Sequence, residues 1–504
     1  MRHWLPTATL AVLAGCGKVE SLAADAGASF TVAVAENAFV RRAESIDVQV
    51  TVDRGAFASD ITIVLPNLPS GVTADDVVIA SGSTAGIVSL DANNAAVQGL
   101  ANVTVRGIGA GSPTSDATLR LLVGGPPGTL DESFAAAGKF ATQAAILGRG
   151  IAATARGTLA TGAGPNLATT VLLSEAGVPD PGFGMAGFSA SGTGDFSEGL
   201  AVTEIADGSV IVAGVAGGPG GGGDLDFGIY KYTAAGALDP TFGVNGIAAF
   251  DPGVGFGEIH SLVIDPNANL VIAGVLFPAA GGIVGRLLRY SSAGVRDVAF
   301  DVTETNTAID GSLLQPDGKL VACGTLNSDF WVARYNPNGT KDASFGTAGV
   351  VTTSFSPKSS AASAVIGLAG GKLLVVGIAG GNVALVRYNA NGSLDTTFAG
   401  SGKLTTVAGF GTRALNSAVV DDQGRILVVG FVGTAPSVQR ILSEGAMDPS
   451  FALGGVNPVD FGIPGQTNST GGFGIAIDAD KRIVFGGEVG AAGNQHMVVG
   501  RLWP

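Results

Sequence analysis

Cysteine, histidine and charged residues are scarce in this chain of 504 residues. It contains two cysteines and three histidines, which excludes a disulfide framework and disfavours a Cys/His zinc site, so we expect no metal and no cofactor. Charged residues make up 13% of the chain and hydrophobic residues 46%, whereas a disordered chain needs low hydropathy with high net charge. No apolar run approaches the roughly 18 to 20 residues that a membrane-spanning helix needs.

Positive charge is especially sparse. Lysine and arginine number 27 against 41 aspartates and glutamates, which gives a net charge of −14. Because no Lys/Arg cluster is present to neutralise phosphates, we expect no nucleic-acid partner. The acidic balance instead favours solubility outside the cytoplasm.

Glycine, in contrast, is abundant, with 80 residues. Together with frequent Val, Ile, Thr and Ala, it is typical of short strands joined by tight turns, and it predicts an all-β fold. The pattern Gly-x-x-Asp-x-x-Phe, centred on an aspartate that we call the anchor, occurs seven times. The anchors are Asp131, Asp180, Asp239, Asp297, Asp342, Asp395 and Asp448. The shortest interval, from Asp297 to Asp342, is 45 residues and the longest, from Asp180 to Asp239, is 59, so one supersecondary unit is repeated.

Each unit contains four apolar runs, the middle two joined by turn residues such as Asp207-Gly208 and Asp317-Gly318. Such pairs suit a two-residue hairpin turn, which needs positive φ. Four strands in 45 to 59 residues predict a β-propeller blade, and seven anchors predict seven blades. The last unit stops before an eighth anchor, so we expect residues 128–134 to complete it; six or eight blades would follow from a different pairing of residues 150–177.

The repeats resemble the delta-60 repeats of bacterial envelope and secreted proteins. The resemblance lies in Leu394-Asp395-Thr396-Thr397-Phe398, in Gln315-Pro316-Asp317-Gly318-Lys319-Leu320-Val321 and in the segment 332–339. It covers about 375 residues and implies a propeller in the cell envelope. That family has no agreed catalytic activity, so the resemblance implies no reaction.

A cation precedes most anchors by eight residues. These cations are Lys231, Arg289, Arg334, Arg387, Arg440 and Arg501, whereas Leu172 takes the place in the first unit. A residue that every blade repeats is needed by every blade, so we interpret the cation, the anchor and its Phe as structural, with the Phe packed between neighbouring sheets. The tyrosines and two of the tryptophans fall in the predicted outer, fourth strands, which disfavours a sugar-stacking surface.

The N-terminus predicts export. A positive start and a short apolar stretch end in Leu13-Ala14-Gly15-Cys16, a pattern typical of a secretory signal. The last four residues resemble the lipobox of bacterial lipoproteins, which implies cleavage before Cys16, its lipidation, and a place in the cell envelope at the outer membrane. The alternative is an ordinary signal cut near Ala24 or Ala26. We expect a signal peptide over 1–15 and a tether over 16–28.

Residues 29–124 predict a separate sandwich of short strands. The run Ile46–Asp53 alternates apolar and polar residues, as a half-buried strand does. The segment Leu68-Pro69-Ser70-Gly71-Val72 resembles bacterial immunoglobulin-like modules. The expected architecture is therefore an Ig-like sandwich over 29–124, acting as a spacer, followed by a propeller over 125–504.

No catalytic motif is evident. His260 and His496 lie in different units without a nucleophile motif, and Asp224 and Asp226 do not match the spacing of calcium loops. Cys323 is expected to be a buried thiol. We therefore expect a non-catalytic, lipid-anchored envelope protein that binds a protein or a cell-surface polymer, with the insertions at 216–226 and 276–283 as its binding surface. The alternatives are a polysaccharide hydrolase or lyase with carboxylates at the propeller pore, and a purely structural protein.

Overall fold

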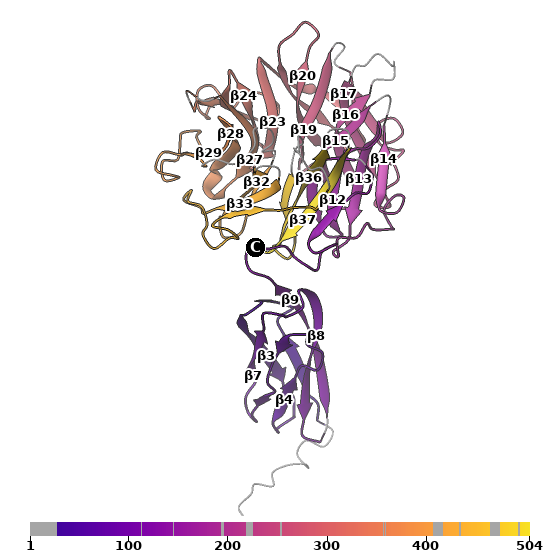
Figure 1. The fold of residues 1–504 in the computed structure, drawn as a ribbon, viewed down its shortest axis with the longest axis vertical. Helices are drawn as coiled ribbons and strands as arrows, with labels where there is room; N and C mark the ends of the chain where they lie inside the picture. The colour runs from indigo at the N-terminus through magenta and orange to yellow at the C-terminus, as the bar shows by residue number, and fades with distance from the viewer. Residues whose placement is uncertain are drawn as a thin grey trace, which may run out of the picture. The chain divides into compact units, whose positions relative to one another are not determined.

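The computed structural model describes residues 28–504, apart from 112, 145, 193–195, 218–224, 252–254, 356, 358, 407–416, 433–434, 464–473 and 492–493. The chain divides into two compact units, the first ending at Gly124 and the second running from Gly125 to Pro504. Strands dominate both units (Figure 1). The described residues include one short 3-10 helix, Ala369–Gly371.

The first unit consists of two sheets, one with the strand order β1-β3-β7-β5 and one with the order β2-β9-β8-β4-β6. Its strands are β1 (Thr31–Val34), β2 (Asn37–Arg41), β3 (Ser45–Asp53), β4 (Ile61–Val64), β5 (Val72–Thr73), β6 (Val77–Ile79), β7 (Ala85–Ala92), β8 (Gly99–Gly109) and β9 (Thr114–Gly124). The predicted alternation is present in β3, where Val48, Val50 and Val52 are buried and the residues between them are exposed. One hydrophobic core fills the unit, with the rings of Phe30 and Phe57 5.1 Å apart.

The second unit repeats one motif, a set of four antiparallel strands that follow one another in the chain. The first three complete sets are β11 (Leu147–Thr154), β12 (Gly157–Ala163), β13 (Ala168–Leu173) and β14 (Phe188–Ser191); β15 (Ser197–Glu204), β16 (Val210–Gly217), β17 (Leu225–Tyr232) and β18 (Ile247–Phe250); and β19 (Phe256–Ile264), β20 (Leu270–Phe277), β21 (Val284–Tyr290) and β22 (Arg296–Thr305). The next three are β23 (Thr307–Leu314), β24 (Leu320–Leu326), β25 (Asp329–Tyr335) and β26 (Val350–Thr353); β27 (Ser360–Gly367), β28 (Leu373–Ala379), β29 (Asn382–Tyr388) and β30 (Lys403–Thr405); and β31 (Ala418–Val420), β32 (Ile426–Val432), β33 (Ala435–Ile441) and β34 (Val456–Pro458). A single bridge, Val284 to Thr307, joins the third and fourth of these sets into an eight-stranded sheet.

The remaining set combines the two ends of the unit. Strands β35 (Gly474–Ile477), β36 (Ile483–Ala491) and β37 (Asn494–Leu502) are completed by β10 (Lys139–Ala141), which pairs with β37. Leu130 also forms a bridge with Leu502. Residues 128–134 therefore contact the last repeat, whereas the strand that completes its set, β10, lies just beyond the predicted segment; this pairing removes an open sheet edge.

One detail of the strand prediction is wrong. The tyrosines lie in the third strand of their sets: Tyr335, for example, is in β25, and Tyr388 is in β29. The fourth strand of each set is instead the short run after the anchor Phe, such as β26, although the sequence pattern places this run at the start of the following unit. The apolar pattern could not separate these choices, because a short run between two turns can pair with the strand on either side.

The hydrophobic core lies between neighbouring sets. Leu159 of β12, for example, belongs to the same buried cluster as Val210 of β16 and Tyr230 of β17. Each set therefore buries its faces against the sets on either side, which holds the first strands of the sets around a shared centre (Figure 1).

Candidate functional site

The repeated anchor residues lie between neighbouring sets, where they form what we call the seam. Each cation contacts the carboxylate of the anchor that follows it by eight residues in the chain. Arg501, near the C-terminus, contacts the first anchor, Asp131, through the set that combines the two ends of the unit. The N–O distances are 2.9 Å for Lys231–Asp239, 3.0 Å for Arg289–Asp297, and 2.7 Å for Arg334–Asp342, Arg387–Asp395, Arg440–Asp448 and Arg501–Asp131. None of these residues is among those that line the cavity described below, so the structure places them apart from the candidate site.

Every seam arginine except Arg440, whose Nη1 has no hydrogen-bond partner among the described residues, also connects its own set to the next one. The Arg334 guanidinium lies 4.8 Å from the centre of the Phe345 ring and donates to the carbonyl of Ala390, in the following repeat, at 2.7 Å. Arg387 donates in the same way to the carbonyl of Ser443 at 2.6 Å. A charge-assisted hydrogen bond and a cation–π contact at the same buried position explain why the cation recurs.

The first complete set replaces the missing cation with one from elsewhere in the chain. Arg156, in the turn between β11 and β12, lies 6.0 Å from the Phe183 ring and donates to the carbonyl of Ala234 in the next repeat at 2.6 Å. The anchor Asp180 accepts a hydrogen bond from the backbone of Gly182 at 2.9 Å. The structural requirement is therefore met even though the sequence position holds Leu172.

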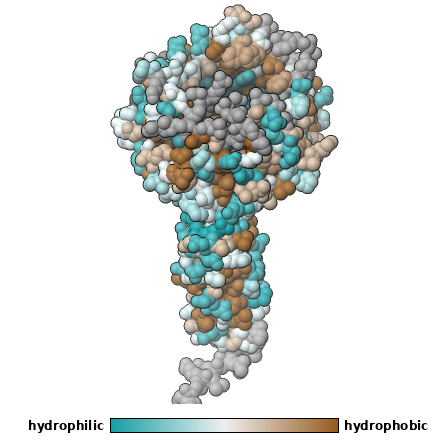
Figure 2. Space-filling model, in the orientation of Figure 1, coloured by the Kyte–Doolittle hydropathy of each residue, from teal (hydrophilic) through white to brown (hydrophobic). Residues whose placement is uncertain are grey.

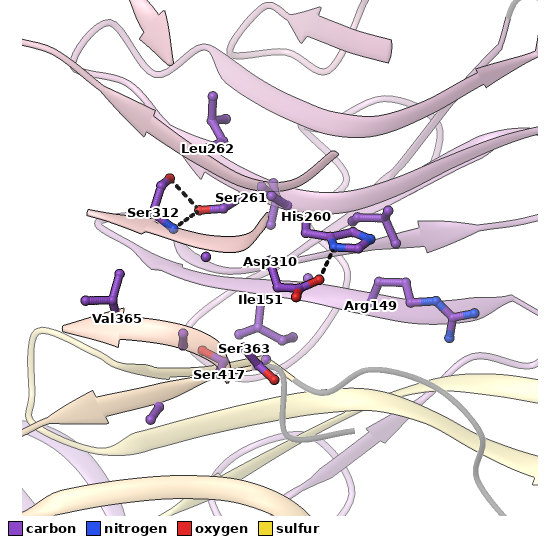
Figure 3. A pocket seen from close by; sticks show the side chains of 18 of the residues that line it. Arg149, Ile151, His260, Ser261, Leu262, Asp310, Ser312, Ser363, Val365 and Ser417 are labelled. Carbon is purple, nitrogen blue, oxygen red and sulfur yellow. Dashed lines mark hydrogen bonds and ion pairs between the residues drawn. The ribbon is translucent and has the colours of Figure 1, made fainter. Parts of the chain in front are cut away.

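A different set of residues surrounds a cavity of about 520 Å³ in the second unit. Its walls come from the first strands β11, β15, β19, β23 and β27, together with Ser417, Ala418 and Gly474. Figure 3 shows side chains from several of these strands directed toward one another around this space. First strands of different sets meet only at the centre of the unit, so we call this space the central cavity.

Five of the first strands carry a β-bulge at an equivalent position. The register shifts between Gly148 and Gly150, Gly199 and Ala201, Ile259 and Ser261, Ile309 and Gly311, and Ala362 and Ala364. The extra residues are Arg149, Leu200, His260, Asp310 and Ser363, and all five line the cavity. Since a bulge re-aims a side chain out of the regular pleat, the bulges account for a ring of diverse side chains at one level of the cavity, which we call the bulge ring.

The charged members of the bulge ring are each held in an ionic triad. Arg149 lies 2.7 Å from Glu198 and 2.6 Å from Glu488. His260 lies 2.8 Å from Asp310 through Nδ1 (Figure 3). Through Nε2 it lies 3.0 Å from Glu258. The two triads bring together carboxylates from four strands, and two of these carboxylates, Glu258 and Asp310, line the cavity.

These contacts change the protonation of the groups. Although burial alone would lower the pKa of His260, its hydrogen bonds to Asp310 and Glu258 raise that pKa to about 10, so the imidazole is a cation at neutral pH. The hydrogen bond from His260 holds the pKa of Glu258 below its usual value. Burial, in contrast, raises the pKa of Glu198, despite the attraction of Arg149. Neighbouring carboxylates with pKa values shifted in opposite directions are often found at functional sites.

The geometry excludes a serine nucleophile activated by His260. Both nitrogens of His260 are bound to carboxylates, and the hydroxyl of Ser261 lies 2.8 Å from that of Ser312 instead. A protonated imidazole also has no lone pair with which to accept the proton of a hydroxyl group. Ser363 and Ser417 line the same cavity and contribute two further hydroxyl groups.

Sequence reasoning did not single out Arg149, Glu198, Glu258 or Asp310. The available sign was a charged residue inside an otherwise apolar first strand, as in Ala308-Ile309-Asp310-Gly311, in a chain where only 13% of residues are charged. The sequence draws attention to His260 but does not predict its contacts with Asp310 and Glu258. The other candidates lie elsewhere: His496 Nδ1 is 2.7 Å from the carbonyl of Thr142, and Cys323 is fully buried, as predicted.

Several predicted features fall outside the described residues. They are Cys16 with the rest of 1–27, Asp224, and most of the insertion at 216–226. Among the residues that are described, no group of three or more possible metal ligands occurs. None of the described segments forms a helix with the length and apolarity needed to cross a membrane.

Three stretches of the chain match the family model "Domain of unknown function (DUF5122) beta-propeller", at residues 205–242, 315–345 and 371–398. Each match begins near the turn between the first two strands of a set and ends at the anchor Phe. A search of curated proteins found no match.

Solved structures give distant likenesses. The apo form of prolyl oligopeptidase B from Galerina marginata is 10% identical, with a TM-score of 0.34, over 66% of this chain and 46% of that one. The same enzyme bound to a 35mer substrate is 10% identical, with a TM-score of 0.33, over 60% of this chain and 42% of that one. The chain thus spans less than half the length of these proteins, and likenesses this weak carry no argument about activity. Together, the four-stranded sets and the family match identify an all-β protein with repeats of the β-propeller type.

Proposed function

We propose that the protein is an exported, lipid-anchored binding protein of the cell envelope, and that it captures its partner at the central cavity of a seven-bladed propeller. One observation carries the binding role. The seam is nearly the same in every repeat, whereas the bulge ring holds Arg149, Leu200, His260, Asp310 and Ser363 at equivalent positions. A scaffold needs no such diversity at its centre, and a concave site with convergent polar groups is the usual form of a binding site.

The blade count rests on the strand sets. Six complete sets and the composite set of β35, β36, β37 and β10 give seven groups of four strands. The first unit, with its two sheets, is proposed to be an Ig-like spacer between the lipid and the propeller. The proposed partner is a protein or a cell-surface polymer, since the anchor would hold the cavity at the cell envelope.

The proposed anchor is tested by labelling cells with a palmitate analogue. Lipidation at Cys16 predicts labelling of the wild-type protein and none of Cys16→Ser. Equal labelling of the two proteins would refute the anchor and would leave the binding role of the cavity standing.

The binding role is tested by filling the cavity. Leu200→Trp adds a large side chain to the bulge ring, whereas Val244→Trp makes the same addition at a residue that is 76% exposed and lines no described part of the cavity. Tagged full-length proteins are incubated with envelope extract, and captured material is identified by mass spectrometry. We expect wild type and Val244→Trp to enrich the same partner and Leu200→Trp to lose it. Retention by Leu200→Trp would move the site elsewhere, with the insertions at 216–226 and 276–283 as the next surfaces to delete.

A second candidate function is hydrolysis or lysis of an extracellular polysaccharide. The observation in its favour is the convergence of Glu198, Glu258 and Asp310, which supplies carboxylates of raised and lowered pKa within one network. Such an enzyme would release reducing ends or unsaturated sugars from an envelope glycan, and Glu258→Gln would abolish the release. Asp422→Asn, which removes a carboxylate that is 60% exposed and lines no described part of the cavity, is the matched control. Absence of product from wild type, or the same rate from Glu258→Gln, would eliminate this candidate.

A further inference from the structure

The ionic network beside the central cavity has more acidic than basic members, because it includes Glu198 and Glu488, which contact Arg149 but are not themselves lining residues. Four carboxylates, Glu198, Glu258, Asp310 and Glu488, surround two cations, Arg149 and His260. With His260 protonated, the network carries two more negative than positive charges. Each cation already lies between two carboxylates, so neither has spare charge to offer the cavity.

The carboxylates also keep unused acceptor atoms. His260 contacts Oε2 of Glu258 and Oδ1 of Asp310, and within the described residues the other oxygen of each has no hydrogen-bond partner. Both side chains line the cavity and are partly exposed, Glu258 at 37% and Asp310 at 26%. The hydroxyl groups of Ser363 and Ser417 line the same space and add further acceptors.

A buried carboxylate oxygen of the network, Oε1 of Glu198, also lacks a well-directed hydrogen-bond donor in the described part of the chain. Glu198 is 9% exposed, and its Oε1 has no hydrogen-bond partner among the described residues. Arg149 Nε lies 2.7 Å from this oxygen, which satisfies the charge but not the direction of a hydrogen bond. Glu198 itself is not among the residues that line the cavity, so its carboxylate contributes to the site only as negative charge within the ionic network.

We propose that the central cavity binds a cationic nitrogen group, either an alkylammonium or a guanidinium, with Glu258 and Asp310 as its principal acceptors. The proposal rests on the proposed binding function and specifies its ligand. An ammonium has three donors and a guanidinium five, and neither has an acceptor, which suits a wall of carboxylate and hydroxyl oxygens. An anion would meet the excess negative charge of the network, and the described lining contains no Phe, Tyr or Trp ring on which a sugar could stack.

The test is calorimetric titration of the full-length protein with cadaverine, agmatine and 1,5-pentanediol. Cadaverine and the diol have the same carbon chain, so their comparison isolates the charge. We expect saturable binding of the amines, weakening as ionic strength rises, and none of the diol. Equal binding of cadaverine and the diol, or no binding of either amine, would overturn the proposal.

Variants locate the binding. Because a hydrogen bond to a charged group contributes about 1.5–3 kcal/mol, Glu258→Gln and Asp310→Asn should each weaken amine binding at least about tenfold, whereas Asp422→Asn should not. Leu200→Lys keeps all four carboxylates and places an ammonium in the bulge ring, so it should abolish amine binding and raise the melting temperature. Because this variant is expected to stay folded, its loss of amine binding cannot be attributed to unfolding, which remains an alternative explanation for Glu258→Gln and Asp310→Asn. Normal amine binding by Leu200→Lys, or equal loss in Asp422→Asn, would refute the assignment.

The source of the cation is distinguished by a second titration. A short peptide containing one exposed Lys or Arg competes with cadaverine if a protein side chain is the ligand, whereas a free polyamine that binds in the presence of excess peptide indicates a small molecule. Either result supports the proposal. If neither the peptide nor the free polyamine binds, the proposal is contradicted. If Leu200→Trp loses its envelope partner while no amine binds to wild type, the binding function stands and only the cationic ligand is refuted.

Discussion

The ring closure offers the sharpest test of the seam. Asp131 is fully buried and contacts Arg501 at 2.7 Å and Arg482 at 3.6 Å, and the two arginines are 3% and 1% exposed. The variant Asp131→Asn keeps the shape of the side chain but removes its charge. Two buried cations then lose a partner in an environment that does not solvate them.

The magnitude follows from what each arginine keeps. Breaking a buried ion pair by removing one partner costs about 3–5 kcal/mol. Arg482 retains Asp478 at 2.8 Å, and Arg501 retains Glu175 at 3.5 Å, so the cost should lie near 3 kcal/mol, at the low end of that range.

Asp297→Asn is the matched control, since it occupies the same place in the motif. Its partner Arg289 is 25% exposed and Asp297 itself is 34% exposed. Surface pairs of this kind contribute about 0–1 kcal/mol. The two substitutions should therefore differ by at least about 2 kcal/mol although their sequence context is alike.

Hydrogen exchange followed by mass spectrometry can measure this difference in the full-length protein. In Asp131→Asn, peptides from β10 and β37 should exchange roughly a hundredfold faster than in wild type, because about 1.4 kcal/mol corresponds to a factor of ten. In Asp297→Asn they should be unchanged. Equal acceleration in both variants, or unaltered exchange in β37 of Asp131→Asn, would show that burial does not decide the strength of these pairs.

Three further predictions concern the repeats. Gly236 has φ +79, and a Cβ there would lie 2.4 Å from the backbone nitrogen of Gly184. Gly236→Ala should therefore lower the melting temperature of the second unit well beyond Gly400→Ala, where φ is +71 and nothing lies within 4 Å; the latter should cost only about 1 kcal/mol. The hydrogen bond from Thr241 and the contact with Lys231 lower the pKa of Asp239 from 3.8 to about 2. Its folded pKa is therefore the lower one, so its stabilisation is present above about pH 4 and is lost as pH falls toward 2, and acid unfolding curves of Asp239→Asn should lack that component. Phe345 is fully buried, so Phe345→Ala should cost about 3–5 kcal/mol in denaturant titration, and a loss below 1 kcal/mol would contradict its packing role.

The repeated four-stranded sets and the seam residues could be predicted from the sequence because the motif recurs. Every copy places a glycine with positive φ, a carboxylate and a buried Phe at the same spacing, so the pattern stands out against a chain that is otherwise rich in small residues. The partnership of Arg334 with Asp342 could be anticipated because both recur together. The role of Arg156 could not, since it lies in a turn outside the motif and reaches Phe183 only in the folded structure.

The central cavity was hidden for the opposite reason. His260 and Asp310 are 50 residues apart in the chain and become partners only because their strands are neighbours in space. Each bulge adds one residue to a regular strand and so interrupts the alternation of apolar and polar residues. In the sequence this interruption looks like an irregular strand, and it does not indicate that a side chain is directed into a cavity. Because the bulge residues differ in type from repeat to repeat, they produce no recurring sequence pattern. Their contacts with one another can be recognised only in the folded structure.

On the face of the second unit shown in Figure 2, hydrophilic and hydrophobic residues are interspersed. Several large apolar side chains are nevertheless well exposed, among them Met185 at 85%, Val244 at 76% and Leu453 at 80%. Each follows an anchor Phe by two residues. Apolar residues that occur singly are normal on a protein surface, so these three side chains do not by themselves mark a recognition site.

The pairing of β10 with β37 has a consequence for the order of folding. Arg501 and Asp131 are separated by 370 residues, and contacts this distant in sequence form slowly because a long loop must close first. A chain that emerges from its N-terminal end can stack one set on the next as it appears, but the composite set must wait for β37. During that interval the strands on either side of the gap expose unpaired backbone groups, so the newly made protein is most open to aggregation or proteolysis just before this last pairing forms.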